Sequence, residues 1–205
     1  KCRYHISQLS SQKSIEVIKH RKEIVKFTSG VSINNLSLNE NDIGDFRTFL
    51  KLSPPLRTET DRNALVQGLN DETIDVIVSD HKPEDEENKR LTFAQAETGA
   101  SGIETLLPLS LELYHNGSVA LETIIKALTS KPAEILKINK GNLSIGNDAD
   151  FCIVDINKPW VVRKEKLISK SKNTPIEDKK LQGKVISTFV NGLSLIHISE
   201  PTRPL

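Results

Sequence analysis

Apolar residues follow two different patterns along this chain, one typical of helices and one typical of buried strands. Apolar positions recur at helical spacing around Ile15 and Ile18, and again over residues 121–128. This spacing places the apolar side chains on one face and therefore predicts two amphipathic helices. Residues 74–78, with the sequence IDVIV, are instead almost continuously apolar. Such a run is typical of a parallel strand that is buried on both faces.

Further segments extend this alternation of strands and helices over residues 1–137. Strands are predicted at residues 3–9 and in the sequence EIVKFTSGVSI, and helices at residues 61–69 and 101–117. Ser10 or Ser11 can cap the start of the first helix, and Gly117 suits the end of a later one. Alternating strands and helices predict a parallel α/β domain.

Residues 138–192 follow a different pattern. Short β-rich runs alternate with turns that contain Gly, Asn and Asp, which predicts a small β-sandwich. The sequence after Gly192 continues neither pattern, and we interpret residues 193–205 as a non-native extension of vector or adapter origin. A genuine disordered tail is the alternative, and it would carry no functional information.

The composition excludes several classes of function. Hydrophobic residues make up 37% of the chain and charged residues 27%, which is enough to bury a core and remain soluble. The net charge of +1 gives no electrostatic basis for binding nucleic acid or a membrane surface. No apolar run approaches the roughly 20 residues of a membrane span, and no signal peptide is recognisable. Cys2 and Cys152 form no metal or redox motif, so we expect a cytoplasmic, reducing environment.

The chain reads as the carboxy-terminal part of a longer protein. It contains no Met, and it begins inside the first predicted strand. We therefore expect this chain by itself to be inactive. We also expect it to aggregate or fold poorly, because a partial barrel leaves strand edges unpaired.

Asp80 is the first candidate for chemistry, since it follows the buried run at residues 74–78. In parallel barrels the reacting groups lie at the carboxyl ends of the strands. A carboxylate there can bind a divalent metal and accept a proton from metal-bound water. Taken alone, an Asp-His pair after a strand is better explained by capping of the next turn. His81 is as consistent with packing as with a role beside the site, and the charged run 84–90 predicts a solvated loop.

Four motifs give Asp80 a specific context. The sequences SPPLR (53–57), SDHKP (79–83), GIETLLPL (102–109) and SKNTP (171–175) occur in this order. In this order they resemble the carboxy-terminal half of dihydroorotases of the long bacterial class, within the amidohydrolase superfamily. The resemblance covers about residues 3–192. It implies that residues 1–137 supply about strands 6–8 of a (β/α)8 metallo-dependent hydrolase barrel, and residues 138–192 a segment of a β-sandwich.

The resemblance also implies a reaction and a cofactor. Dihydroorotases cyclise N-carbamoyl-L-aspartate reversibly to dihydroorotate in pyrimidine biosynthesis, usually with zinc. Asp80 matches the eighth-strand residue that is both metal ligand and general acid/base. Gly99 matches a glycine whose backbone approaches the substrate. The remaining ligands lie outside this chain or are replaced.

Three positions depart from the family pattern. Gln8 stands where the sixth strand carries a metal-binding His, and a neutral amide is a poor zinc ligand. Ser53 replaces an Asn that contacts the substrate. Glu84 replaces a His that contacts the substrate carboxylate, and its own carboxylate would repel an anion, for which Lys82 could compensate.

These departures leave three functions open. The first is an active dihydroorotase, a homo-oligomer with a small-molecule substrate. The second is a non-catalytic homologue that serves as a scaffold for aspartate transcarbamoylase, which the three replacements favour. The third is a related cyclic amidase, such as an allantoinase or a dihydropyrimidinase. The order of the motifs favours the first.

Overall fold

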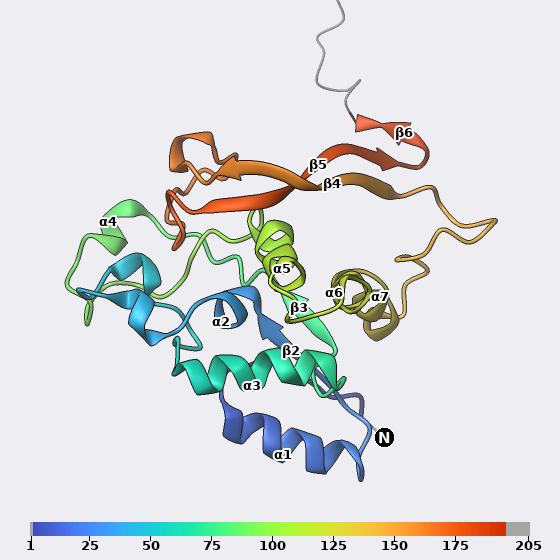
Figure 1. Cartoon of the computed structure of the whole chain (residues 1–205), viewed down its shortest axis with the longest axis horizontal. Coiled ribbons are helices and arrows are strands. Elements are labelled where there is room, and N and C mark those ends of the chain that lie inside the picture. The colour runs from blue at the N-terminus through green and yellow to red at the C-terminus, as the bar shows by residue number, and fades with distance from the viewer. Residues whose placement is uncertain (1, 196–205) are drawn as a thin grey trace, which may run out of the picture.

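The computed structural model of the chain describes residues 2–195 and contains two β-sheets separated by helix α5 (Figure 1). The first sheet is parallel and has the strand order β1 (His5–Leu9), β2 (Thr28–Ser32), β3 (Val76–Val78). The second sheet is antiparallel and consists of β4 (Phe151–Val161), β5 (Lys180–Val190) and β6 (Leu193–Ser194).

Helices connect the strands and cover the parallel sheet. Their bounds are α1 Gln12–Lys22, α2 Ile33–Ser37, α3 Glu59–Asn70, α4 Glu86–Lys89, α5 Leu106–His115, α6 Leu121–Leu128 and α7 Ser130–Leu136, with short 3-10 helices η1 Glu40–Ile43, η2 Thr48–Leu50 and η3 Lys164–Lys166. Helices α1 and α3 lie side by side, and α6 packs against β3 (Figure 1). No helix of the described residues is long and apolar enough to cross a membrane.

The predicted strands and helices of residues 1–137 are confirmed in most cases. Helix α1 begins after Ser11, whose hydroxyl accepts the N–H of Ser14, and it buries Ile15 and Ile18. A serine cap satisfies a backbone donor that the first turn leaves unpaired. The apolar run before Asp80 forms a parallel strand, in which Val76 and Ile77 are both buried.

Parallel strands bring their carboxyl ends to one edge of the sheet. In this chain these ends are Leu9, Ser32 and Val78. Neighbouring strands are in register near this edge, with Ser32 opposite Val78. Residues just before or after these ends, such as Gln8 and Asp80, therefore meet even though they are far apart in the sequence.

Several local predictions were wrong. The predicted strand EIVKFTSGVSI is shorter than expected and ends at Ser32, because Ile33 begins helix α2, in which Asn34 and Asn35 are buried. The charged run 84–90 contains helix α4, and Lys89 within it is buried. The amphipathic helix predicted over residues 121–128 is confirmed as α6, and Pro132 lies in the first turn of the next helix, α7, where its missing N–H breaks no helical hydrogen bond.

The carboxy-terminal region also differs from its prediction. Strands β4 and β5 each span 11 residues instead of forming several short runs. Within residues 2–195 they belong to one antiparallel sheet, and a second layer of a sandwich is not among the described elements. Leu193 and Ser194, at the start of the predicted extension, pair with β5 as strand β6. The rest of that extension, residues 196–205, lies outside the described residues.

A single hydrophobic core joins the two sheets. Its members come from the parallel sheet and its helices, such as Val31 and Leu109, and from the carboxy-terminal region, such as Val162 and Leu181. Strand β5 approaches α5 closely at Gly183, where an added Cβ would lie 2.3 Å from a methyl carbon of Leu111. The glycine therefore permits the antiparallel sheet to pack directly on α5.

Candidate functional site

Asp80 lies where the sequence predicted it, just beyond the carboxyl end of β3. Its φ angle is +48°, in the left-handed region that side chains other than glycine adopt at a cost. Aspartate tolerates this region better than most residues. The turn directs the chain away from the sheet and leaves the carboxylate half-buried at the sheet edge. Strain of this kind is common at functional sites.

Gln8, near the end of β1, contacts Asp80 directly. The Nε2 atom of Gln8 donates a hydrogen bond to Oδ1 of Asp80 at 2.6 Å. Burial raises the pKa of Asp80, while hydrogen bonds from Gln8 and Ser32 and the charge of Lys82 act in the opposite direction. A carboxyl group with a raised pKa is better suited to exchange protons near neutral pH. The sequence singled out both residues, and the fold brings them into contact.

Gly99 lies beside the segment that follows Asp80. His81 and Ala100 form an isolated parallel bridge, and the backbone N–H of Lys82 donates to the carbonyl of Ala100 at 2.9 Å. Gly99 has a φ angle of +140°, and an added Cβ would lie 2.5 Å from the carbonyl oxygen of Lys82. Its N–H donates to the carbonyl of Lys51, so this donor is used within the protein.

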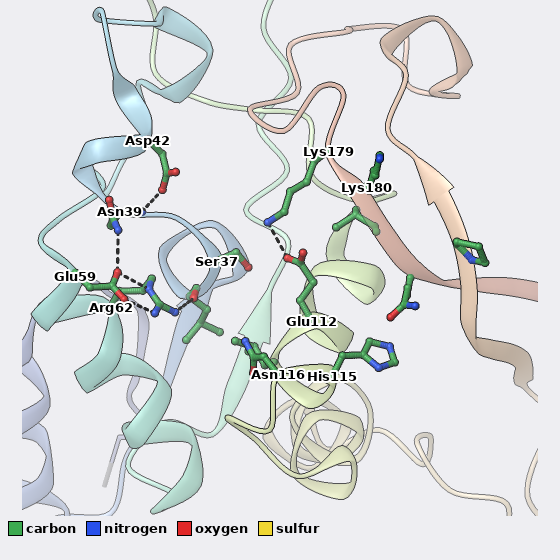
Figure 2. A pocket seen from close by; sticks show the side chains of 15 residues that line it. Ser37, Asn39, Asp42, Glu59, Arg62, Glu112, His115, Asn116, Lys179 and Lys180 are labelled. Carbon is green, nitrogen blue, oxygen red and sulfur yellow. Dashed lines mark hydrogen bonds and ion pairs between the residues drawn. The ribbon is translucent and has the colours of Figure 1, made fainter.

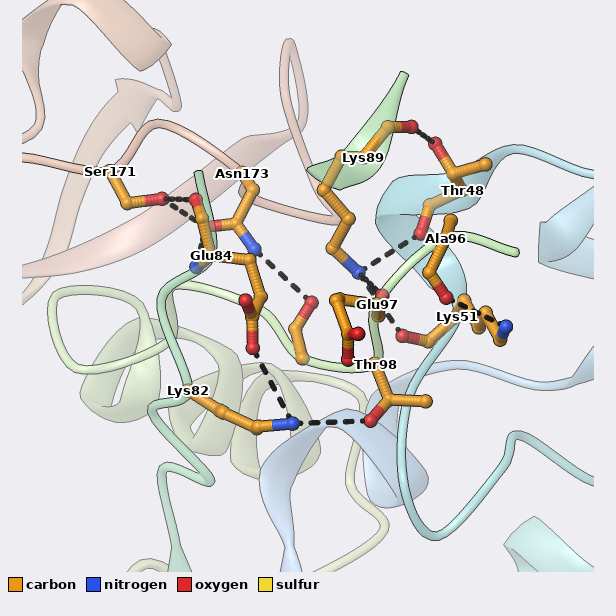
Figure 3. A network of polar contacts seen from close by, with 11 residues as sticks. Thr48, Lys51, Lys82, Glu84, Lys89, Ala96, Glu97, Thr98, Ser171 and Asn173 are labelled. Carbon is orange, nitrogen blue, oxygen red and sulfur yellow. Dashed lines mark hydrogen bonds and ion pairs between the residues drawn. The ribbon is translucent and has the colours of Figure 1, made fainter. Parts of the chain in front are cut away.

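Asn173, in the SKNTP motif, ties this segment to the carboxy-terminal region. It is only 2% exposed, and its Nδ2 donates to the carbonyl of Gly99 at 3.1 Å. Its Oδ1 accepts hydrogen bonds from the backbone N–H of Glu84 at 3.3 Å and from the hydroxyl of Ser171 (Figure 3). The same oxygen accepts a hydrogen bond from the hydroxyl of Ser101 at 3.0 Å. In the sequence this motif served only as one of four in a characteristic order, and none of the contacts of Asn173 was predicted. Because the amide group of this buried asparagine has hydrogen-bond partners on both of its atoms, it fixes the segment around Gly99 relative to the segment around Glu84.

The remaining sequence-predicted residues have simpler surroundings. His81 Nδ1 accepts the backbone N–H of Gly102 at 3.2 Å, which is a structural contact and not a ligand position. Ser53 is exposed to solvent in the loop after η2. Glu84 forms an ion pair with Lys82, with an Nζ to Oε1 distance of 3.4 Å.

Comparison with known proteins places this arrangement in a family. Residues 3–195 match the description "Amidohydrolase family". The chain belongs to the amidohydrolase family. The resemblance to dihydroorotases that the motifs predicted is also confirmed.

Among curated relatives, this amidohydrolase chain is similar to the dihydroorotases of Ehrlichia canis and Anaplasma phagocytophilum. It is 44% identical to the first and 40% identical to the second, in each case over 190 residues, or 92% of this chain and 42% of the relative. The chain therefore spans less than half the length of these relatives.

Solved structures support the fold. An L-hydantoinase (dihydropyrimidinase) from Arthrobacter aurescens matches with a TM-score of 0.90 at 27% identity, over 95% of this chain and 45% of that chain. A dihydropyrimidinase from Brevibacillus agri matches with a TM-score of 0.87 at 21% identity, over 95% of this chain and 44% of that chain. The amidohydrolase chain thus has the α/β fold of this group of hydrolases.

The residues of this amidohydrolase chain do not by themselves fit a zinc centre. Within residues 2–195, no group of three or more His, Cys, Asp and Glu side chains converges on one point. Gln8 presents its amide nitrogen, a donor, to Asp80. His5, at the opposite end of the same strand, is bonded to the hydroxyl of Thr28 at 2.8 Å. Asp80 is thus the candidate ligand at this edge, and it already accepts a hydrogen bond.

A cavity of about 830 Å³ lies elsewhere in the amidohydrolase chain, between α2, α3, α5 and the antiparallel sheet (Figure 2). Its opposite walls carry the ion pairs Glu59–Arg62 and Glu112–Lys179. Asp80 and Gly99 do not line it. Because Asp80 and the motif residues around it lie elsewhere, and four charged groups of the cavity form these two ion pairs, we place the candidate site at the edge of the parallel sheet.

Lys89 is a buried structural residue near the candidate site that the sequence did not reveal. Its side chain is buried, with 1% of the residue exposed, and its ammonium donates to three backbone carbonyls (Figure 3). The acceptors belong to Glu97 at 2.7 Å, Thr48 at 3.2 Å and Lys51 at 3.3 Å. Lys89 therefore holds the segment that precedes Gly99 against the loop after η2. Burial is the main cause that lowers the pKa of Lys89 to about 8.

The lowered pKa of Lys89 predicts a stability that depends on pH. Between about pH 8 and the ordinary lysine value of 10.5, the unfolded chain binds more protons than the folded chain, so the contribution of Lys89 to stability rises with pH. A chimaera in which this chain replaces the matched part of the Ehrlichia canis relative provides a complete protein for the test. The Tm advantage of this chimaera over its Lys89→Met variant is expected to be larger at pH 10 than at pH 7.

The exposed residue Lys166 provides the matched control. Its replacement by Met removes the same charge from a solvated position, and the Tm difference should then show no comparable rise with pH. A Tm difference for Lys89→Met that stays constant from pH 7 to pH 10 would contradict the prediction.

Proposed function

We propose that this chain is the carboxy-terminal part of a dihydroorotase, which interconverts N-carbamoyl-L-aspartate and dihydroorotate. The 44% identity over 190 residues to the Ehrlichia canis dihydroorotase is the observation that carries this proposal. In the complete protein, residues 1–137 would supply strands 6–8 of a (β/α)8 barrel, and residues 138–192 a segment of its β-sandwich. The meeting of Gln8 and Asp80 at one sheet edge supports this arrangement.

Asp80 would carry the proton transfers of the reaction. Ring closure forms the bond between the carbamoyl nitrogen and the side-chain carboxylate carbon; one proton from that nitrogen and one taken up from solvent leave with a carboxylate oxygen as water, and ring opening reverses these changes. A half-buried carboxylate with a raised pKa can accept and return such a proton. The Gln8 amide would orient this carboxylate through its hydrogen bond. Zinc is the metal that the resemblance implies, with Asp80 as its ligand from this chain.

A second candidate function is a non-catalytic homologue that serves as a scaffold for aspartate transcarbamoylase. The hydrogen bond from Gln8 to Asp80 favours it, because the position of an expected imidazole ligand carries an amide donor instead. A third candidate is a cyclic amidase with another substrate, which the structural similarity to an L-hydantoinase (dihydropyrimidinase) favours.

The chimaera with the Ehrlichia canis relative separates these candidates. We expect it to retain zinc through purification and to interconvert carbamoyl aspartate and dihydroorotate. Activity is measured with zinc supplied, beside the unaltered relative, and metal content by atomic spectroscopy. A folded chimaera without turnover of any cyclic amide would support the scaffold. Turnover of hydantoin or dihydrouracil, without turnover of dihydroorotate, would support the third candidate.

A further inference from the structure

The side chain of Lys82 is held in a defined position beside Asp80. Its stem crosses Gly99, where an added Cβ would lie 3.0 Å from both Cβ and Cδ of Lys82. Its ammonium donates to the hydroxyl of Thr98 at 3.2 Å (Figure 3). The absence of a side chain at Gly99 therefore provides the space in which this stem lies. A long lysine side chain on a free surface would have no such constraint.

Glu84 forms the other contact of this ammonium but does not cover it. The Nζ to Oε1 distance is 3.4 Å, which is long for an ion pair with a hydrogen bond. The side chain of Lys82 is 54% exposed, whereas that of Glu84 is 16% exposed. The cation is therefore more accessible to a molecule arriving from solvent than the carboxylate is. Since an ammonium has three N–H donors, one direction remains for a ligand in addition to these two contacts.

Asn173 holds the two segments that form this arrangement. It bonds to the backbone of Glu84 on one side and to that of Gly99 on the other. Lys82 is also close enough to Asp80 for its charge to lower the pKa of that carboxyl group, against the larger effect of burial. A ligand whose reacting bond lies at Asp80 would thus have a fixed positive charge nearby.

We infer that Lys82 is a specificity-determining residue whose ammonium binds a carboxylate of the substrate. This inference rests on the proposed function, because carbamoyl aspartate and dihydroorotate both carry a carboxylate that does not react. Lysine is suited to this role as a point charge on a flexible stem, which Gly99 and Thr98 orient here. The partial neutralisation of Glu84 by Lys82 also removes the repulsion that the sequence predicted at that position.

Kinetics of the chimaera test the inference. Lys82→Gln is expected to raise KM for dihydroorotate at least about 10-fold and to change kcat less than about 3-fold, since loss of a charge-assisted hydrogen bond weakens binding. Lys82→Arg, which keeps the charge, should retain KM within about 3-fold. Lys166→Gln, at an exposed position, is the matched control and should leave both constants unchanged.

Ionic strength supplies a readout that a structural role would not change. Added salt should raise KM for the unsubstituted chimaera and have little effect on Lys82→Gln, because screening acts on the charge that the substitution removes. An unchanged KM in Lys82→Gln, or an equal loss in Lys82→Arg, would overturn the inference.

Binding distinguishes this inference from the proposed function. If the unsubstituted chimaera shows no turnover, the proposed catalytic function fails, and calorimetric binding of dihydroorotate still tests Lys82. Binding that weakens about 10-fold in Lys82→Gln would then support the inference. No binding, or equal binding by both proteins, would overturn it.

Discussion

Replacement of Asp80 by Asn is expected to lower kcat/KM of the chimaera for dihydroorotate by at least about 1,000-fold. The amide has nearly the same shape as the carboxylate but cannot accept a proton, and general acid–base catalysis alone contributes about 10²–10⁴-fold. The loss of negative charge would also weaken any metal held at this edge. Initial rates in both reaction directions, with zinc supplied in excess, measure the effect.

Asp85→Asn is the matched control for this experiment. Asp85 is an exposed aspartate five residues further along the chain, and its side chain makes no capping hydrogen bond to α4. Its replacement should change kcat/KM less than about 2-fold. If Asp80→Asn kept more than a tenth of the activity, Asp80 would not be the proton carrier, whatever the family resemblance.

Replacement of Gly99 by Ala is expected to cause the second large effect, a loss of about 2–6 kcal/mol in stability. The φ angle of +140° is unfavourable for any residue with a Cβ, at about 1–3 kcal/mol. The added carbon would also meet the Lys82 carbonyl oxygen at 2.5 Å, and overpacking of this kind costs about 1–3 kcal/mol more. Thermal unfolding of the chimaera, followed by circular dichroism, should show a clearly lower Tm.

Gly44→Ala separates the two contributions. Gly44 also has a positive φ angle, +54°, but an added Cβ would have no heavy atom within 4 Å. This control carries backbone strain without the steric contact, so its Tm should fall less than that of Gly99→Ala. An equal fall in Tm for both variants would mean that the steric contact between the added Cβ and Lys82 contributes nothing to the loss of stability.

The parallel sheet and the position of Asp80 could be predicted from the sequence because both depend on local pattern. A continuous apolar run such as residues 74–78 indicates a buried parallel strand, and the residue after such a strand lies at the sheet edge. Gln8 was recognised by its motif. Its hydrogen bond to Asp80 depends on which strands are neighbours, and this follows only from the three-dimensional order of β1, β2 and β3.

Lys89 and Asn173 could not be predicted, because their surroundings come from distant segments. Lys89 lies in a run of charged residues that resembles a solvated loop. Its ammonium group nevertheless donates hydrogen bonds to three backbone carbonyls of two other segments instead of to water. Asn173 likewise finds its partners at Gly99, Ser101 and Glu84. Buried polar residues of this kind depend on tertiary contacts and leave no periodic pattern in the sequence.

The core that joins the two sheets has a consequence for evolution and engineering. Val162 and Leu181, from the antiparallel region, are packed in the same cluster as Leu109 of helix α5. Recombination between related enzymes at a point near residue 137 would combine two halves of one core that had never been selected to fit. Viable exchanges should therefore carry both sheets together, so that this stretch is inherited as one unit.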